Sequence, residues 1–232
     1  MHINVEELVK DISALASLPE IYLEIRNLID DPSSELDDFA IVVNTDPGLS
    51  SSVLKIVNSA FFNFPGQIGD ISKALNLIGI AQLHDLVLGV SAINALELPN
   101  DIESLKTFWR RSIFCGSLAR LLAKSTHLQD SDSLFVIGLL HEIGHLVLFA
   151  KLPEQSKQII QKARDEHCSL PEIEQAQLNT NYGRIGQALM AEWNLPYKFQ
   201  SITGGHCELD NSSEYSIEMA IIHLSHQLAV NK

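Results

Sequence analysis

Apolar residues along the chain repeat at the spacing of α-helices, with polar positions between them. Asp46-Pro47 supplies a helix N-cap and a proline for the first helical position. One face of an amphipathic helix then follows, made of Leu49, Val53, Ile56, Val57 and Ala60. We find no run of alternating apolar and polar residues bounded by turn residues, which is the pattern of a strand. The pattern therefore predicts an all-α fold.

Further helix signals lie in the second half of the sequence. Ser169 to Glu172 matches a capping box with a proline in the first turn. Ile185, Leu189 and Trp193 mark a later helix. The last helix is marked by Ile217, Ile221, Leu224 and Leu228.

Breaks rich in proline, glycine, serine and aspartate interrupt this pattern at residues 30–34, 63–66, 98–101 and 204–213. The third break separates a run of short helices from a run of longer ones. We therefore expect a two-lobed helical bundle, with an N-terminal lobe of residues 1–100 and a C-terminal lobe of residues 101–232. Together the lobes form one continuous domain.

Charge and composition narrow the class of protein. The 232 residues include 16 Lys and Arg against 29 Asp and Glu, so the net charge is −13 with histidine neutral. That charge argues against nucleic acid and anionic membrane as partners, because phosphates are repelled. Three widely spaced cysteines and a polar N-terminus indicate a cytoplasmic protein with reduced thiols. The apolar stretch 134–150 contains three ionisable residues, which argues against a membrane span.

That apolar stretch also contains His141-Glu142-Ile143-Gly144-His145, which matches the zinc-protease pattern H-E-x-x-H. On one continuous helix, a spacing of four places His141 and His145 on the same face, with Glu142 as a general base. However, no predicted strand precedes the motif to bind a peptide substrate. A zinc peptidase is therefore a remote alternative.

A known family matches the sequence from about residue 10 to about residue 230, in order. The matching segments are Leu18-Pro19-Glu20, Leu36–Val43, Thr45–Leu49, Val53–Phe62, Ile71–Gly79, Phe108–Ser112, Gly138–Gly144, Ile185-Gly186, Trp193–Pro196 and His206. This series resembles the HDOD domain, the HD-related output domain of bacterial signalling proteins. The resemblance implies an HD-like C-terminal half.

That half of the family resembles HD phosphohydrolases, whose divalent metal site uses a histidine, a His-Asp pair and a later aspartate. On this chain the first histidine position corresponds to Arg111, the pair to His141-Glu142 and the last aspartate to His226. Only His141 is unchanged. Because a guanidinium does not ligate metals and stays charged, the resemblance implies a degenerate site.

Arg111 and Glu142 carry opposite charges at positions that the resemblance makes neighbours, so we expect them to form an ion pair. Tyr182 and His206 fall where relatives with additional metal ligands carry histidines. His145 falls where relatives often carry lysine. Tyr182 and His145 are further candidates for the pocket, and His145 is also explained as a satisfied polar group on a helix flank.

Neither a metal nor a cofactor is expected. If a metal does bind, the candidate ligands are His141, Glu142, His206 and His226, because imidazoles and carboxylates suit divalent ions. The resemblance implies a non-catalytic bacterial signal-transduction module that binds a signalling protein or a small ligand at the groove between the lobes. The alternative from the enzyme class is a metal-dependent HD phosphohydrolase acting on nucleotides or cyclic dinucleotides.

Overall fold

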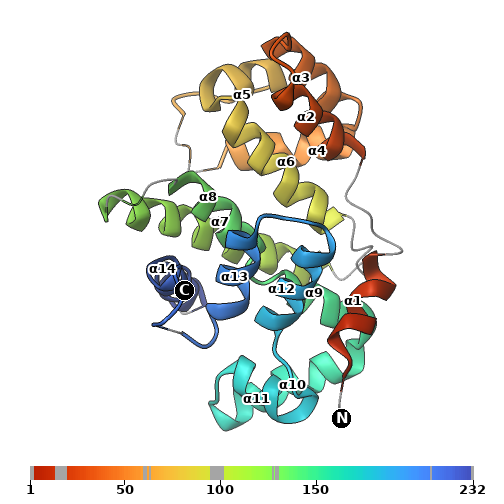
Figure 1. Ribbon diagram of the computed structural model, residues 1–232, viewed down its shortest axis with the longest axis vertical. Helices are drawn as coiled ribbons and strands as arrows, with labels where there is room; N and C mark the ends of the chain where they lie inside the picture. The colour runs from red at the N-terminus through yellow and green to blue at the C-terminus, as the bar shows by residue number, and fades with distance from the viewer. Residues whose placement is uncertain are drawn as a thin grey trace. The chain divides into compact units, whose positions relative to one another are not determined.

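The structure is a computed structural model that describes residues 3–13, 20–59, 62, 64–94, 102–126, 128, 131–209 and 211–230. Every regular element in these ranges is a helix, so the all-α prediction is confirmed (Figure 1). The chain divides into two compact units. The smaller unit contains residues 18–95, and the larger unit contains residues 1–17 and 96–232.

The smaller unit is built from five consecutive helices: α2 (Glu20–Asp30), α3 (Leu36–Asn44), α4 (Pro47–Val57), α5 (Ile71–Ile78) and α6 (Ile80–Asn94). Helix α6 contacts each of the other four, so it forms the centre of the unit. Buried side chains from several helices form its core, among them Ile25, Phe39, Val53, Leu75 and Leu83.

Helix α4 begins where its sequence signal predicts. The Asp46 carboxylate accepts hydrogen bonds from the backbone N–H groups of Gly48 (2.8 Å) and Leu49 (3.1 Å), and Pro47 is the first helical residue. These bonds satisfy two of the donors that a helix N-terminus leaves unpaired. The helix ends at Val57. Ala60, the last residue of the predicted repeat, lies outside the described residues.

The larger unit contains the remaining helices: α1 (Val5–Ser13), α7 (Ile102–Ser125), α8 (Ser131–Leu140), α9 (Ile143–Lys151), α10 (Pro153–Glu166), α11 (Leu170–Leu178), α12 (Tyr182–Glu192), α13 (Tyr197–Gly205) and α14 (Ser216–Val230). Helix α7 packs against α8 and α14, and α12 packs against α13, α9 and α1. Helix α1 therefore belongs with the C-terminal helices, which differs from the expected lobe of residues 1–100. The predicted break at 98–101 lies outside the described residues.

Glycines allow two pairs of helices in the larger unit to approach closely. A Cβ atom at Gly138 on α8 would lie 2.7 Å from the backbone nitrogen of Gly116 on α7. A Cβ at Gly144 on α9 would collide with the carbonyl oxygen of Tyr182 and lie 2.9 Å from the nitrogen of Gly186, both on α12. These contacts hold α8 and α9 deep within the unit.

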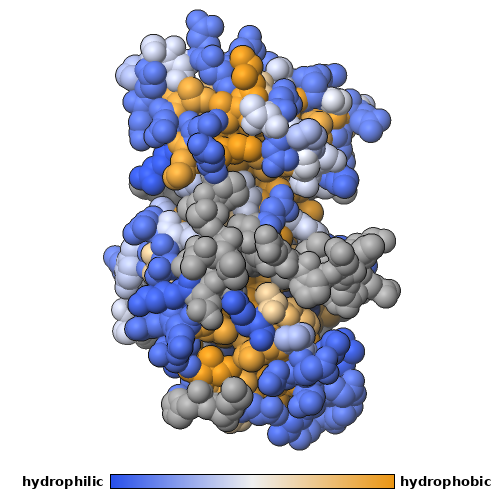
Figure 2. Space-filling view, turned by 90° about the vertical axis from the view of Figure 1, so that its right-hand side faces the viewer, coloured by the Kyte–Doolittle hydropathy of each residue, from blue (hydrophilic) through white to orange (hydrophobic). Residues whose placement is uncertain are grey.

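The segment Ser133–Lys151 has the length and hydropathy of a membrane span, but 89% of it is buried inside the fold. It forms part of the core of the larger unit. On the face shown in Figure 2, hydrophilic side chains cover much of each unit, and smaller groups of apolar side chains lie among the hydrophilic ones.

Two sequence signals in the larger unit have outcomes that differ from the prediction. Helix α11 begins at Leu170, but the predicted capping box does not form, because the Ser169 side chain makes no cap hydrogen bond. The apolar repeat at the C-terminus correctly predicts α14. Of its four members, however, only Ile221 is buried, whereas Ile217, Leu224 and Leu228 are 56%, 49% and 47% exposed.

Candidate functional site

The candidate site is built around a break between two core helices. Helix α8 ends at Leu140, His141 and Glu142 form a turn, and α9 begins at Ile143. The side chains of His141 and Glu142 are buried, at 0% and 1% exposure. A buried carboxylate requires a charged or hydrogen-bonding partner.

The partner of Glu142 is Arg111 on α7. Arg111 Nε lies 3.4 Å from Glu142 Oε2, and the arginine side chain is 32% exposed. The ion pair predicted from the sequence is therefore present. Neither of these two atoms has a hydrogen-bond partner, so the contact is electrostatic.

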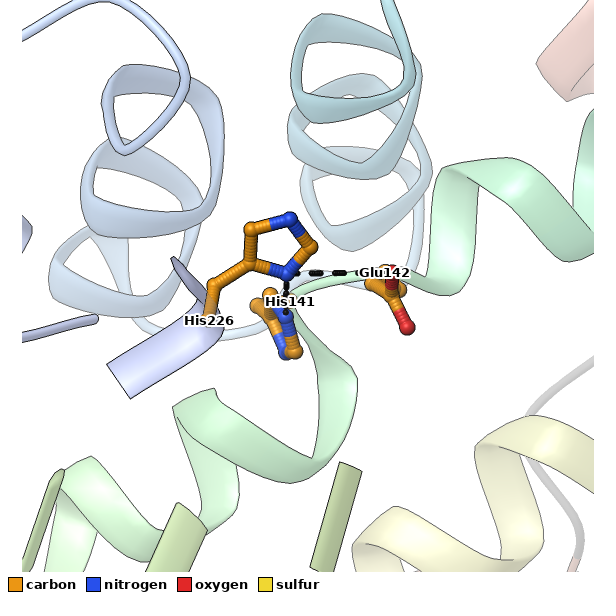
Figure 3. Close-up of side chains that lie close together, drawn as sticks. All are labelled: His141, Glu142 and His226. Carbon is orange, nitrogen blue, oxygen red and sulfur yellow. Dashed lines mark hydrogen bonds and ion pairs between the residues drawn. The ribbon is translucent and has the colours of Figure 1, made fainter. Parts of the chain in front are cut away.

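His226 on α14 completes the group of four aligned positions, of which Figure 3 shows His141, Glu142 and His226. The Nδ1–H of His141 donates to the carbonyl oxygen of Gly138 at 2.7 Å, so its Nε2 carries no proton when the ring is neutral. That Nε2 lies 2.9 Å from His226 Nδ1 and accepts its proton in a hydrogen bond. His226 Nδ1 is also 3.7 Å from Glu142 Oε1. The structure thus brings together all four positions that the resemblance aligned.

A second buried group adjoins the first through the ring of His206. The Nδ1–H of His206 donates to the carbonyl oxygen of Thr203 at 2.6 Å, and its Nε2 accepts from the Tyr182 hydroxyl at 3.2 Å. The His206 ring packs edge-on against His141, with centroids 5.4 Å apart. Both ring nitrogens of His206 are therefore engaged by protein groups.

His145 lies on the other side of Tyr182. The two rings stack with centroids 3.9 Å apart, and His145 Nδ1 is 3.2 Å from Glu174 Oε1. The other oxygen of Glu174 accepts from the backbone N–H of Tyr182 at 2.7 Å. His145 is thus a satisfied polar group, and Glu174 holds both the imidazole and the first residue of α12.

The sequence reasoning missed Glu174, which is 2% exposed. The available signal was its position on α11, since Leu170, Glu174 and Leu178 are four residues apart and share one helix face. A carboxylate on an apolar helix face indicates a buried partner.

Burial favours the neutral form of three histidines of the site, namely His141, His206 and His226. Burial lowers the pKa of His206 to about 4 and the pKa of His226 to about 3. Burial, with the neighbouring imidazoles, lowers the pKa of His141 well below its ordinary value. At neutral pH the positive charge beside Glu142 therefore comes from Arg111.

The donor set fits a divalent metal poorly. The ligand atoms of His141, Glu142 and His226 lie within 4.8 Å of one another, close enough to surround an ion. However, a fixed guanidinium contacts the carboxylate, and the two imidazoles are hydrogen-bonded to each other. His206, the fourth candidate ligand, is engaged by Thr203 and Tyr182.

The zinc-peptidase geometry is absent. His141 lies in the turn before α9 and contacts His226, whereas His145 lies within α9 and contacts Glu174. The prediction that both histidines share one helix face is wrong, because the helix is interrupted at 141–142. The described residues therefore do not form a site in which both histidines bind one zinc ion.

Comparison with known proteins identifies the family of this chain. The HDOD domain matches residues 15–209, which is most of the chain. The chain belongs to the HDOD domain family.

Individual relatives are more distant. An uncharacterized protein from Treponema pallidum is 29% identical over 205 residues, which cover 88% of this chain but 39% of that protein. The chain therefore spans about two-fifths of that relative's length.

Solved structures confirm the fold. An HDOD domain protein of unknown function from Geobacter sulfurreducens has a TM-score of 0.78 at 20% identity, covering 98% of this chain and 78% of that one. A Marinobacter aquaeolei protein is provisionally described as a signal transduction protein. It has a TM-score of 0.77 at 23% identity, and the match covers 100% of this chain and 51% of that one. A Shewanella amazonensis protein is provisionally described as a phosphohydrolase. It has a TM-score of 0.78 at 22% identity, and the match covers 97% of this chain and 80% of that one.

Proposed function

We propose that this chain is a non-catalytic regulatory module of bacterial, cytoplasmic signal transduction. It acts by binding a signalling protein or a small ligand. Such a module works through a difference in affinity for its partner between two states, which requires no reaction chemistry. Membership of the HDOD family supports the regulatory role.

One observation carries the non-catalytic part of the proposal, namely the contact between Arg111 and Glu142. Two unit charges about 4 Å apart interact by about 4 kcal/mol at an effective dielectric constant of about 20, and a divalent ion doubles that value. Arg111 would therefore repel a divalent ion about 4 Å away by about 8 kcal/mol, which offsets the attraction of the Glu142 carboxylate for that ion. The neutral imidazoles of His141 and His226 already satisfy each other.

The test is elemental analysis of the whole chain, purified without added metal and then incubated with Mn²⁺, Zn²⁺ or Fe²⁺ in turn. Hydrolysis of nucleotides, cyclic dinucleotides and a chromogenic phosphodiester is measured on the same samples. We expect less than stoichiometric metal and no turnover with any of these ions.

Matched variants show whether Arg111 is responsible. Arg111→Lys keeps the positive charge and should remain free of metal. The triple variant Arg111→His, Glu142→Asp and His226→Asp has the HD ligand set and should gain metal affinity. Metal binding by Arg111→Lys, or by the unchanged chain, would contradict the proposal.

A metal-dependent phosphohydrolase is the second candidate, because the ligand atoms of His141, Glu142 and His226 do converge within 4.8 Å. This candidate predicts stoichiometric metal and phosphodiester hydrolysis by the unchanged chain. It also predicts loss of both on replacing His226 with alanine. The same measurements therefore decide between the two functions.

A further inference from the structure

A surface groove with a volume of about 720 Å³ lies in the larger unit. It is lined by residues of α12, α13 and α14 and of the segment 206–215 that joins α13 to α14 (Figure 1). A groove of this size can hold a small molecule or the side chains of a bound peptide. The four aligned positions of the candidate site do not line it, so the groove is a separate feature.

Two neighbouring tyrosines give this groove an aromatic edge. Tyr197 lines the groove and is 63% exposed. Tyr215 lies beside it, with ring centroids 6.4 Å apart and ring planes tilted by 57°. An accessible tyrosine ring attracts cations to its negative face, and guanidinium groups occur there more often than ammonium groups. The tyrosine pair therefore favours a cationic occupant.

The charged side chains that line the groove leave one carboxylate unpaired. Arg184, the one Lys or Arg among the lining residues, donates to Glu208 at 3.0 Å, so this pair carries no net charge. Glu214 also lines the groove, and it forms no ion pair with any residue that the structure describes. Burial and the charge of Glu214 raise the pKa of the neighbouring Tyr215. The electrostatic potential beside the tyrosines is therefore negative.

The backbone adds to this negative potential. Helix α13 ends at Gly205, and both Gly204 and Gly205 line the groove. The last turn of a helix has carbonyl oxygens without intrahelical partners and carries a partial negative charge. No basic residue lies in the last turn of α13 to offset that charge. The net charge of −13 on the whole chain attracts a basic partner in the same way, at longer range.

We propose that this groove binds an arginine side chain from a basic segment of a partner protein. The guanidinium stacks on the ring of Tyr197 and donates hydrogen bonds to the carboxylate of Glu214. Arginine fits better than lysine, because its planar group has five N–H donors to share between a carboxylate and the carbonyl oxygens at the end of α13. This inference rests on the proposed function in one respect, namely that the occupant belongs to a partner protein.

The test is fluorescence anisotropy of the full chain with a labelled peptide of alternating glycine and arginine. Matched peptides carry citrulline, which keeps the shape of arginine without its charge, or lysine. We expect the arginine peptide to bind, the citrulline peptide to bind at least about tenfold more weakly, and the lysine peptide to fall between them. No binding of the arginine peptide up to the solubility limit of the chain overturns the proposal, as does equal binding of the citrulline or lysine peptide.

Two variants at exposed positions show whether the peptide binds in the groove. Glu214→Gln should raise the dissociation constant of the arginine peptide about tenfold, and Tyr197→Leu should raise it severalfold. The matched control is Glu24→Gln, which removes the same charge from an exposed position on α2 in the smaller unit and should leave the constant unchanged. Equal weakening in Glu214→Gln and Glu24→Gln would show general attraction to an acidic chain and would overturn the assignment.

Propylguanidine distinguishes a partner protein from a free small ligand, because it has the side chain of arginine without a peptide backbone. We expect it to compete with the arginine peptide only at much higher concentration, since the groove is larger than one side chain. Propylguanidine that binds as tightly as the peptide overturns the assignment to a partner protein. These measurements do not depend on metal or turnover, so their failure is distinct from a failure of the proposed non-catalytic function.

Discussion

Arg111 and Glu142 define the electrostatics of the candidate site at the scale of single residues. Glu142 is 1% exposed, so its charge depends on the guanidinium 3.4 Å away. Arg111 is one-third exposed and keeps part of its hydration. Removing Arg111 therefore costs more stability than removing Glu142, because the buried carboxylate loses its counter-charge whereas the guanidinium remains partly hydrated.

This inequality predicts the effect of removing one partner. Arg111→Met leaves a buried carboxylate without its counter-charge and should lower the free energy of unfolding by about 3 kcal/mol, at the low end for a buried pair because Arg111 is partly exposed. The double variant Arg111→Met, Glu142→Gln removes both charges and should recover most of that loss. Urea unfolding monitored by circular dichroism measures both values. An unchanged unfolding midpoint in Arg111→Met would show that the pair contributes nothing to stability.

At the scale of elements, the break between α8 and α9 determines which histidines meet. It directs His141 toward α14 and leaves His145 facing α11. The approach of α9 to α12 is equally important, because Tyr182 contacts His206 on one side and His145 on the other. Gly144 permits that approach, since a Cβ there meets the α12 backbone.

Gly144→Ala therefore forces α9 and α12 apart. We expect a loss of stability of about 3 kcal/mol, the upper end for overpacking, because the obstructing atoms belong to the backbone and not to a flexible side chain. Gly69→Ala is the control, since a Cβ there meets nothing within 4 Å. Thermal unfolding of both variants measures the difference. Equal midpoints would mean that the helix contact has room for a methyl group.

The outcome of a local sequence signal depended on whether its hydrogen bonds form, as they do at Asp46 and do not at Ser169. Asp46-Pro47 predicted the start of α4 because the cap bonds span only two or three residues. The break at 141–142 was missed because neither glycine nor proline marks it, and apolar residues continue on both sides. Glu174 was missed because its partners His145 and Tyr182 are brought to it by tertiary packing.

The resemblance to the HDOD family predicted contacts between distant positions, which the periodicity of apolar residues did not predict. The contact between Arg111 and Glu142 joins α7 to the turn after α8, and no spacing rule links positions so far apart. The family alignment linked them, and the structure brought all four aligned positions together. The placement of α1 against α12 was not predicted, because an amphipathic helix shows which face it buries but not against which neighbour.

At the scale of the whole molecule, the buried histidines link stability to pH. His206 and His226 have pKa values of about 4 and about 3 in the folded chain, against 6.5 for the free side chain. Between these values the unfolded chain binds more protons than the folded chain, so stability rises with pH. The stabilisation is complete above about pH 6.5 and is lost progressively as the pH falls toward 3.

Urea unfolding at a series of pH values measures this link. Each of the two histidines should contribute about 1.4 kcal/mol per pH unit within its window. His206→Gln should reduce the slope between about pH 4 and 6.5 by that amount. The control is His167→Asn, at an exposed position with φ of 53° that asparagine tolerates. An unchanged slope in His206→Gln would contradict the assignment of His206 as a buried neutral group.

The buried ion pair also limits how this chain can evolve. Replacing Arg111 by histidine first takes away the guanidinium that faces Glu142. Replacing His226 by aspartate first puts a second carboxylate beside Glu142, where His226 Nδ1 now lies 3.7 Å from Glu142 Oε1. Each of these single steps toward a metal-binding site therefore passes through a less stable protein. Selection for stability therefore acts against both of these first steps.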